Sequence, residues 1–146
     1  MSGVRVNGMF KPLRNLWFWI GLWAFAVLVV IVACLVPPPP LPPLPENGDK
    51  LEHFTAYFLL AASAVQLFRA GRVLLFVGVG LVAMGVCIEF AQGALTATRS
   101  ADAFDALANT IGVVLGLATA LTPLRDVLLR LQPSFSLREK VPRRGG

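Results

Sequence analysis

Charge is scarce in this sequence: only 14% of its 146 residues are Asp, Glu, Lys or Arg, whereas 56% are hydrophobic. A soluble domain normally carries charges on about a quarter of its residues. Reactive side chains are also few, with one histidine, one tyrosine and two cysteines, Cys34 and Cys87, whose spacing suggests neither a metal site nor a redox pair. The sequence contains no recognisable nucleophile motif, phosphate-binding loop or complete metal signature. The composition therefore indicates a membrane protein.

Long apolar runs predict where the chain crosses the membrane. Residues 16–36 carry no charge and, as a helix of about 31 Å, are long enough to cross a bilayer. Three later apolar runs are close to the lower limit of about 17 residues, so the polar residues at their ends are expected to belong to the same helices. We predict an all-α integral membrane bundle of four transmembrane helices, at about 15–36, 50–68, 73–93 and 103–122.

Basic residues fall on one side of this predicted topology. Eleven of the 13 Lys and Arg precede the first span, join the second to the third, or follow the fourth: Arg5, Lys11, Arg14, Arg69, Arg72, Arg125, Arg130, Arg138, Lys140, Arg143 and Arg144. Because such residues concentrate on the cytoplasmic side, the basic N-terminus (1–14), the basic tail (133–146) and hence both termini are predicted to be cytoplasmic. Attraction to anionic lipid explains the net charge of +5, and no nucleic acid partner is predicted.

Two segments outside the spans have distinct patterns. Residues 37–48 contain PPPPLPPLP, which holds seven of the eleven prolines and predicts an extended, extracytoplasmic spacer. Residues 123–132 place leucine and valine at helical spacing opposite charged residues, which predicts a short amphipathic helix at the membrane interface. The basic start and the IVAC sequence ending at Cys34 resemble a bacterial lipoprotein signal. Because the apolar run continues past Cys34, we expect an uncleaved helix.

Polar residues gather at one end of the second, third and fourth predicted spans. We call this set the polar cluster; its members are Asp49, Lys50, His53, Tyr57, Glu89, Gln92, Arg99, Asp102, Asp105 and Asn109. Within each helix they recur three or four residues apart, so each helix has one polar face. A charge near the middle of a span costs about 2.5–3.5 kcal/mol, and these faces are therefore expected to meet one another or a water-filled pocket.

Carboxylates outnumber basic groups in the polar cluster. Either one carboxyl is protonated, with Glu89 as the candidate because it lies deepest in its helix, or a cation completes the site. Asp102 can also act simply as the N-cap of the fourth span. A single histidine is weak evidence for metal ligation, so the sequence alone leads us to predict no metal site and no cofactor.

The motifs around these residues resemble those of the VanZ-like membrane proteins of bacteria. The shared pattern is an Asp-Lys-x-x-His stretch, a Glu-x-x-Gln pair and an Arg-x-x-Asp-x-x-Asp-x-x-x-Asn-x-x-Gly block, over residues 49–116. The resemblance marks the polar cluster and Gly112, and it implies a core of residues 49–122 in the bacterial cytoplasmic membrane. The family is named for a protein that lowers susceptibility to teicoplanin, a glycopeptide that acts on cell-wall precursors; the resemblance does not supply a biochemical activity.

Four functions are compatible with this reading. The leading one is binding of a lipid headgroup or a lipid-linked cell-wall precursor in an outward-facing pocket, where Lys50, His53 and Arg99 meet phosphate. The second is an enzyme acting on a phospholipid or polyprenyl-linked substrate, with His53 or Glu89 as general base. The third is passage of protons or cations. The fourth is a structural or assembly role, in which the cluster locks the helices together; homo-oligomers are open under all four.

Overall fold

The computed structural model describes residues 8–37, 42, 45–97 and 100–132. Within these residues every regular element is a helix, apart from one isolated β-bridge between Phe10 and Phe68. The prediction of an all-α fold is therefore confirmed for the described part of the chain. The elements are α2 (Leu16–Leu35), α3 (Gly48–Leu67), α4 (Arg72–Leu95), α5 (Ala103–Ala118), the 3-10 helices η1 (Thr119–Leu121) and η2 (Pro123–Asp126), and α6 (Val127–Leu131).

Three helical segments are long and apolar enough to cross a membrane: Leu16–Leu35, Arg72–Leu95 and Ala103–Leu121. The helix α3 also has 20 residues, but its first turns contain Asp49, Lys50 and Glu52. The structure thus contains three candidate spans and a fourth helix of matching length whose N-terminal turns are polar.

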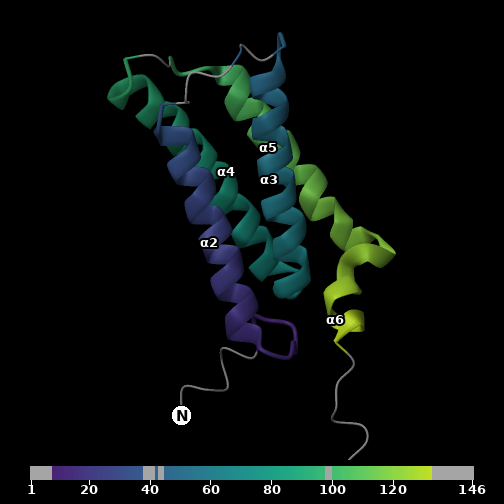
Figure 1. Cartoon of the computed structure of the whole chain (residues 1–146). Helices are drawn as coiled ribbons and strands as arrows, with labels where there is room; N and C mark the ends of the chain where they lie inside the picture. Colours follow the sequence, from purple (N-terminus) through teal and green to yellow (C-terminus); the bar gives the residue numbers. More distant parts are fainter. Residues whose placement is uncertain (1–7, 38–41, 43–44, 98–99, 133–146) are drawn as a thin grey trace, which may run out of the picture.

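The four long helices lie side by side and alternate in direction along the chain (Figure 1). As a result α3 and α5 are parallel, and both begin at the end of the bundle opposite the described N-terminal segment (Figure 1). The contact between α3 and α5 is the most extensive one between helices, and α3 also touches α2 and α4. The central helix is therefore the one whose first turns are polar.

Glycines on α5 permit its close approach to α3. A Cβ atom at Gly112 would lie 2.5 Å from the carbonyl oxygen of Phe54, and one at Gly116 would lie 2.6 Å from that of Phe58. Neither distance is compatible with a side chain unless the backbone moves. Gly112 and Gly116 form a Gly-x-x-x-Gly pair of the kind that lets two helix backbones approach closely.

The helix α2 lies at the periphery of the bundle and contains no buried residue. One face, which includes Trp23, Ala26 and Val30, packs against the core, and the large apolar side chains of its other faces are exposed. A tether to the rest of the bundle comes from Trp23, whose indole Nε1–H donates to the carbonyl oxygen of Leu60 in α3 over 3.0 Å.

The residues before α2 pack onto the turn between α3 and α4, at the end of the bundle opposite the first turns of α3 and α5. The backbone N–H of Lys11 donates to Leu67 O and that of Arg69 donates to Met9 O, each over 2.9 Å. The Lys11 ammonium also lies 2.9 Å from the Asp126 carboxylate in η2 and donates to the backbone oxygen of Arg125. One lysine therefore joins the two ends of the described chain.

The segment expected as one amphipathic helix over residues 123–132 is instead two short pieces. Thr122 caps η2 by accepting from the N–H of Leu124, and Asp126 has non-helical dihedral angles (φ −124°, ψ 23°) that separate η2 from α6. The five residues of α6 form little more than one turn. Most of the proline-rich stretch and the basic tail after residue 132 lie outside the described residues.

Candidate functional site

The first turns of α3 and α5 and the last turns of α4 meet at the end of the bundle opposite the described N-terminal segment (Figure 1). Each of these turns carries polar side chains because the sequence places most of the charged residues of α3, α4 and α5 at this end. Of the polar cluster, six side chains are buried: those of His53, Glu89, Gln92, Asp105, Asn109 and Tyr57. Tyr57, with no exposed surface, lies below the other five. Arg99 lies outside the described residues.

His53 joins α3 to α5. Its Nδ1 is 3.2 Å from the side-chain oxygen Oδ1 of Asn109, and its Nε2 is 3.7 Å from Oδ1 of Asp49, one turn earlier on α3. The first distance is that of a hydrogen bond, and the second is longer than one. The imidazole is thus held at Nδ1, while its other nitrogen is directed toward a carboxylate that it does not reach.

Lys50 lies between the carboxylates that begin α5. Its ammonium is 3.4 Å from Asp102 Oδ2 and 3.8 Å from Asp105 Oδ1. Among the described residues it is the only lysine or arginine with an ion pair to the polar cluster. Because the Lys50 and Asp102 side chains are each 37% exposed, their pair contributes no more than about 1 kcal/mol.

Asp102 organises the start of α5. Its side chain accepts a hydrogen bond of 2.8 Å from the N–H of Phe104, so the predicted N-cap role is confirmed. The N–H of Asp102 itself donates to Oε2 of Glu89 over 3.1 Å. A carboxylate from α4 therefore faces the N-terminal end of α5, where the helix dipole favours negative charge.

Gln92 points to a different partner. Its Nε2 donates to the backbone oxygen of Cys34 over 2.7 Å and thereby satisfies a carbonyl in the last turn of α2. The sequence grouped Gln92 with the residues facing α3 and α5, but its side-chain amide bonds to α2. Nothing in the side chains of α2 signals this contact, because the acceptor is a backbone atom.

Four buried polar atoms at this end have no hydrogen-bond partner among the described residues: Tyr57 Oη, Glu89 Oε1, Asp105 Oδ1 and Asn109 Nδ2. An unsatisfied buried donor or acceptor costs about 1–3 kcal/mol, and most native proteins contain few of them. All four belong to residues that the sequence marked as the polar cluster. These four atoms are thus concentrated at one end of the bundle and have capacity for further hydrogen bonds.

A pocket of about 140 Å³ opens beside His53, between α2 and α3. Its polar lining comes from Asp49, Glu52, His53 and Tyr57, and its apolar wall comes from the end of α2, including Cys34. This wall could not be predicted from the sequence, because α2 carries no charged or amide side chain there. The pocket gives a small molecule or ion access to one face of the polar cluster.

Three side chains here can hold a metal ion. One ligand atom from each of Asp49, His53 and Asp105 lies within 4.8 Å of the other two. Two of these residues come from α3 and one from α5, so the set is assembled only when the two helices pack together.

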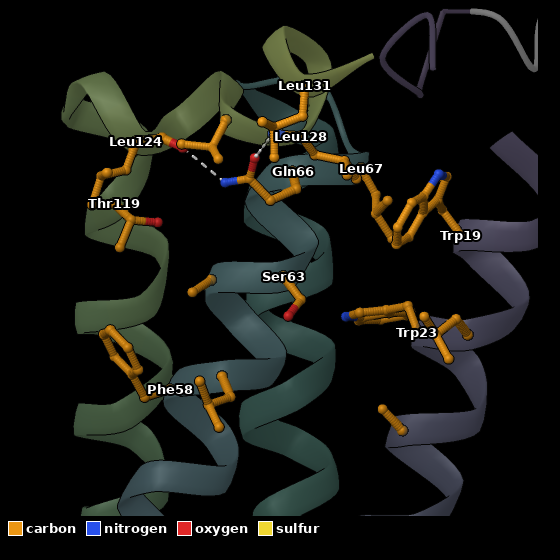
Figure 2. A pocket seen from close by; sticks show the side chains of 15 residues that line it. Trp19, Trp23, Phe58, Ser63, Gln66, Leu67, Thr119, Leu124, Leu128 and Leu131 are labelled. Carbon is orange, nitrogen blue, oxygen red and sulfur yellow. Dashed lines mark hydrogen bonds between the residues drawn. The ribbon is translucent and has the colours of Figure 1, made fainter. Parts of the chain in front are cut away.

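A larger apolar pocket of about 540 Å³ lies toward the opposite end (Figure 2). Trp19 and Trp23 of α2 form one side, and Phe58 of α3 and Leu128 of α6 form others (Figure 2). Gln66 joins α3 to η2 and α6: its side chain donates to Leu124 O over 2.9 Å and accepts from the N–H of Leu128 over 3.1 Å (Figure 2). Gln66 is not among the predicted site residues, although it is an isolated amide in an apolar half-helix.

Comparison with known proteins gives no family for this chain. No protein-family model, no curated protein and no solved structure matches it.

Proposed function

We propose that the chain is a VanZ-like protein of the bacterial cytoplasmic membrane that binds a lipid headgroup or lipid-linked cell-wall precursor at the polar cluster. The observation that carries this proposal is the convergence of buried polar side chains from α3, α4 and α5, four of whose polar atoms lack a partner among the described residues. A headgroup with phosphate, hydroxyl or amine groups offers such partners. The ammonium of Lys50 supplies a phosphate contact.

The proposed topology has four spans with both termini in the cytoplasm. The helix α3 matches α2 in length and packs among three helices that are apolar enough to cross a bilayer. Its central position buries His53 and Tyr57, while the exposed Asp49 and Glu52 lie at the end of the helix, where a charge costs less than at the middle of a span. Lys11 and Arg14 before α2, Arg69 after α3 and Arg72 at the start of α4 lie at the same end of the bundle, and these basic residues support assigning that end to the cytoplasm. In this topology α6 lies at the cytoplasmic interface.

A structural role is the second candidate, and a specific contact favours it. Glu89 accepts from the N–H of Asp102, and Lys50 pairs with two carboxylates of α5, so parts of the cluster satisfy one another. In that case the cluster would join helices without binding a ligand. A decrease in folding stability on charge removal, without any change in bound lipid, would favour this role.

Native mass spectrometry of the protein extracted with its own lipids tests the proposed function. We expect one lipid species to remain on the wild-type protein and to be largely lost from Lys50→Met. The reason is that, among the described residues, the Lys50 ammonium is the one lysine or arginine group paired with the polar cluster. Glu46→Gln is the matched control, since Glu46 is an exposed charge in the turn before α3. Equal retention by a folded Lys50→Met protein would contradict headgroup binding.

A further inference from the structure

We propose that Asp49, His53 and Asp105 bind one divalent transition-metal ion of the zinc class between α3 and α5. The inference goes beyond headgroup binding and does not require it. It rests on the geometry of three side chains, the orientation of an imidazole, an unpartnered buried carboxylate oxygen and the charge of the cluster.

The ligand atoms have a spacing that a metal ion can bridge. They lie within 4.8 Å of one another, whereas the ligands of a tetrahedral zinc ion, with bonds of 2.0–2.1 Å, are about 3.3 Å apart. Closing that difference requires small rotations of side chains. Asp49 is able to make the largest one, because its side chain is 54% exposed at the start of α3.

The imidazole of His53 is oriented as a metal ligand. With the Asn109 amide oriented as in the structure, its oxygen accepts from Nδ1–H, so Nε2 of the neutral ring presents a lone pair toward Asp49. A lone pair and a carboxylate repel each other unless a cation lies between them. Metal-bound histidines commonly donate their other N–H to an oxygen, as His53 does to Asn109.

Asp105 supplies the independent observation. Only 7% of this residue is exposed, and its Oδ1 has no hydrogen-bond partner among the described residues. The nearest cation given by the structure, the Lys50 ammonium, is 3.8 Å away and is shared with Asp102. A buried carboxylate in this position gains a strong partner when a metal ion is bound.

Net charge at the site also favours a cation. Two of its three ligand residues are carboxylates, and Glu52, Glu89 and Asp102 lie at the same end of the bundle. Lys50 is the one lysine or arginine within the described chain that pairs with any of these five carboxylates. The N-termini of α3 and α5 each add a partial positive charge of about one half. The negative excess that remains is offset by a divalent ion.

The ligand set selects the class of metal. One imidazole and two carboxylates suit Zn²⁺ and its spectroscopic substitute Co²⁺, whereas Ca²⁺ and Mg²⁺ prefer oxygen ligands alone. Asp49 and His53 line the 140 Å³ pocket, so the remaining coordination position faces a space that admits water or an oxygen of a larger molecule. Three protein ligands with an open position are typical of catalytic rather than structural zinc sites.

Cobalt titration of the full chain in lipid nanodiscs, after removal of metals with a chelator, tests the proposal. We expect saturable binding of one Co²⁺, seen by its visible absorption and reversed by Zn²⁺. Asp49→Asn should weaken binding at least about tenfold, and it should leave the fold intact because Asp49 is largely exposed. Glu46→Gln, an exposed carboxylate outside the ligand set, should bind as the wild type does.

Lys50→Met gives the opposite and sharper expectation. The ammonium competes with the metal ion for Asp105, so its removal should tighten Co²⁺ binding, while the same variant should lose the retained lipid if the proposed function is correct. Absence of saturable Co²⁺ binding, wild-type affinity in Asp49→Asn, or weaker binding in Lys50→Met would each overturn the metal site. These results would leave the lipid measurement, and the proposed headgroup binding, to be judged separately.

Discussion

At the scale of single residues, the small residues of α5 allow close helix packing, and the polar residues make the contacts between helices. Glycines on α5 set how closely it approaches α3, and that approach brings Asn109 and Asp105 to His53 and Lys50. Helix association in a membrane depends on such close packing, because lipid is as apolar as the side chains that it replaces. The polar contacts therefore depend on residues that carry no chemistry themselves.

A methyl group at Gly112 tests this dependence. Gly112→Ala places a Cβ 2.5 Å from Phe54 O, which forces α5 away from α3 and should lower stability by about 1–3 kcal/mol. Thermal unfolding in detergent measures the effect. Gly80→Ala is the control: nothing lies within 4 Å of the added atom, and the better helix propensity of alanine should leave the melting temperature equal or higher. Equal melting temperatures for wild type and Gly112→Ala would contradict the packing described above.

At the scale of elements, the two ends of the described chain are held together by an ion pair rather than by a helix interface. The Lys11 ammonium donates a hydrogen bond to Asp126 and so holds the pKa of that carboxyl below its usual value of 3.8, an effect that Arg125 reinforces. A carboxyl with a lowered pKa in the folded state stabilises that state above its unfolded pKa. The docking of the N-terminal segment is therefore expected to be intact at neutral pH.

Acid should release this docking. As the pH falls from 3.8 through the lower folded pKa, Asp126 becomes protonated and its contribution is lost. Hydrogen exchange of the Lys11 and Arg69 amides, corrected for intrinsic rates, should show protection at neutral pH and less protection well below 3.8. Asp126→Asn should show the weaker protection at both pH values. Identical protection in that variant and the wild type would show that the ion pair does not hold the segment.

At the scale of the whole molecule, α3 decides the architecture. Three helical segments are apolar enough to cross a membrane, and the proposed fourth span is the helix that they surround. Hydropathy alone does not select α3, because Asp49, Lys50 and Glu52 lie in its first turns. In the proposed topology His53 meets α5, and the exposed Asp49 and Glu52 lie at the end of α3, where a charge costs less than at the middle of a span.

Labelling of introduced cysteines decides whether α3 crosses. In a background with Cys34 and Cys87 replaced by serine, we expect Glu46→Cys to react with an impermeant maleimide from outside intact spheroplasts. Ala70→Cys, exposed in the turn after α3, should react only after the membrane is made permeable. Both sites are exposed in the structure, so a difference between them reports their side of the membrane. Reaction of both from the same side would contradict the proposed four spans.

The sequence by itself determined the all-helical fold of the described chain and the polar ends of α3, α4 and α5, and it offered Asp102 as an N-cap, because periodicity, hydropathy and capping are local properties of the chain. The tertiary structure decided which polar groups meet. The parallel packing of α3 and α5 brings His53 to Asn109, although the two residues are 56 positions apart. Gln92 donates to a backbone oxygen of α2, a contact that the pattern of side chains in the sequence does not predict. Such pairings depend on helix approach, which Gly112 and Gly116 allow, and not on the spacing within any one helix.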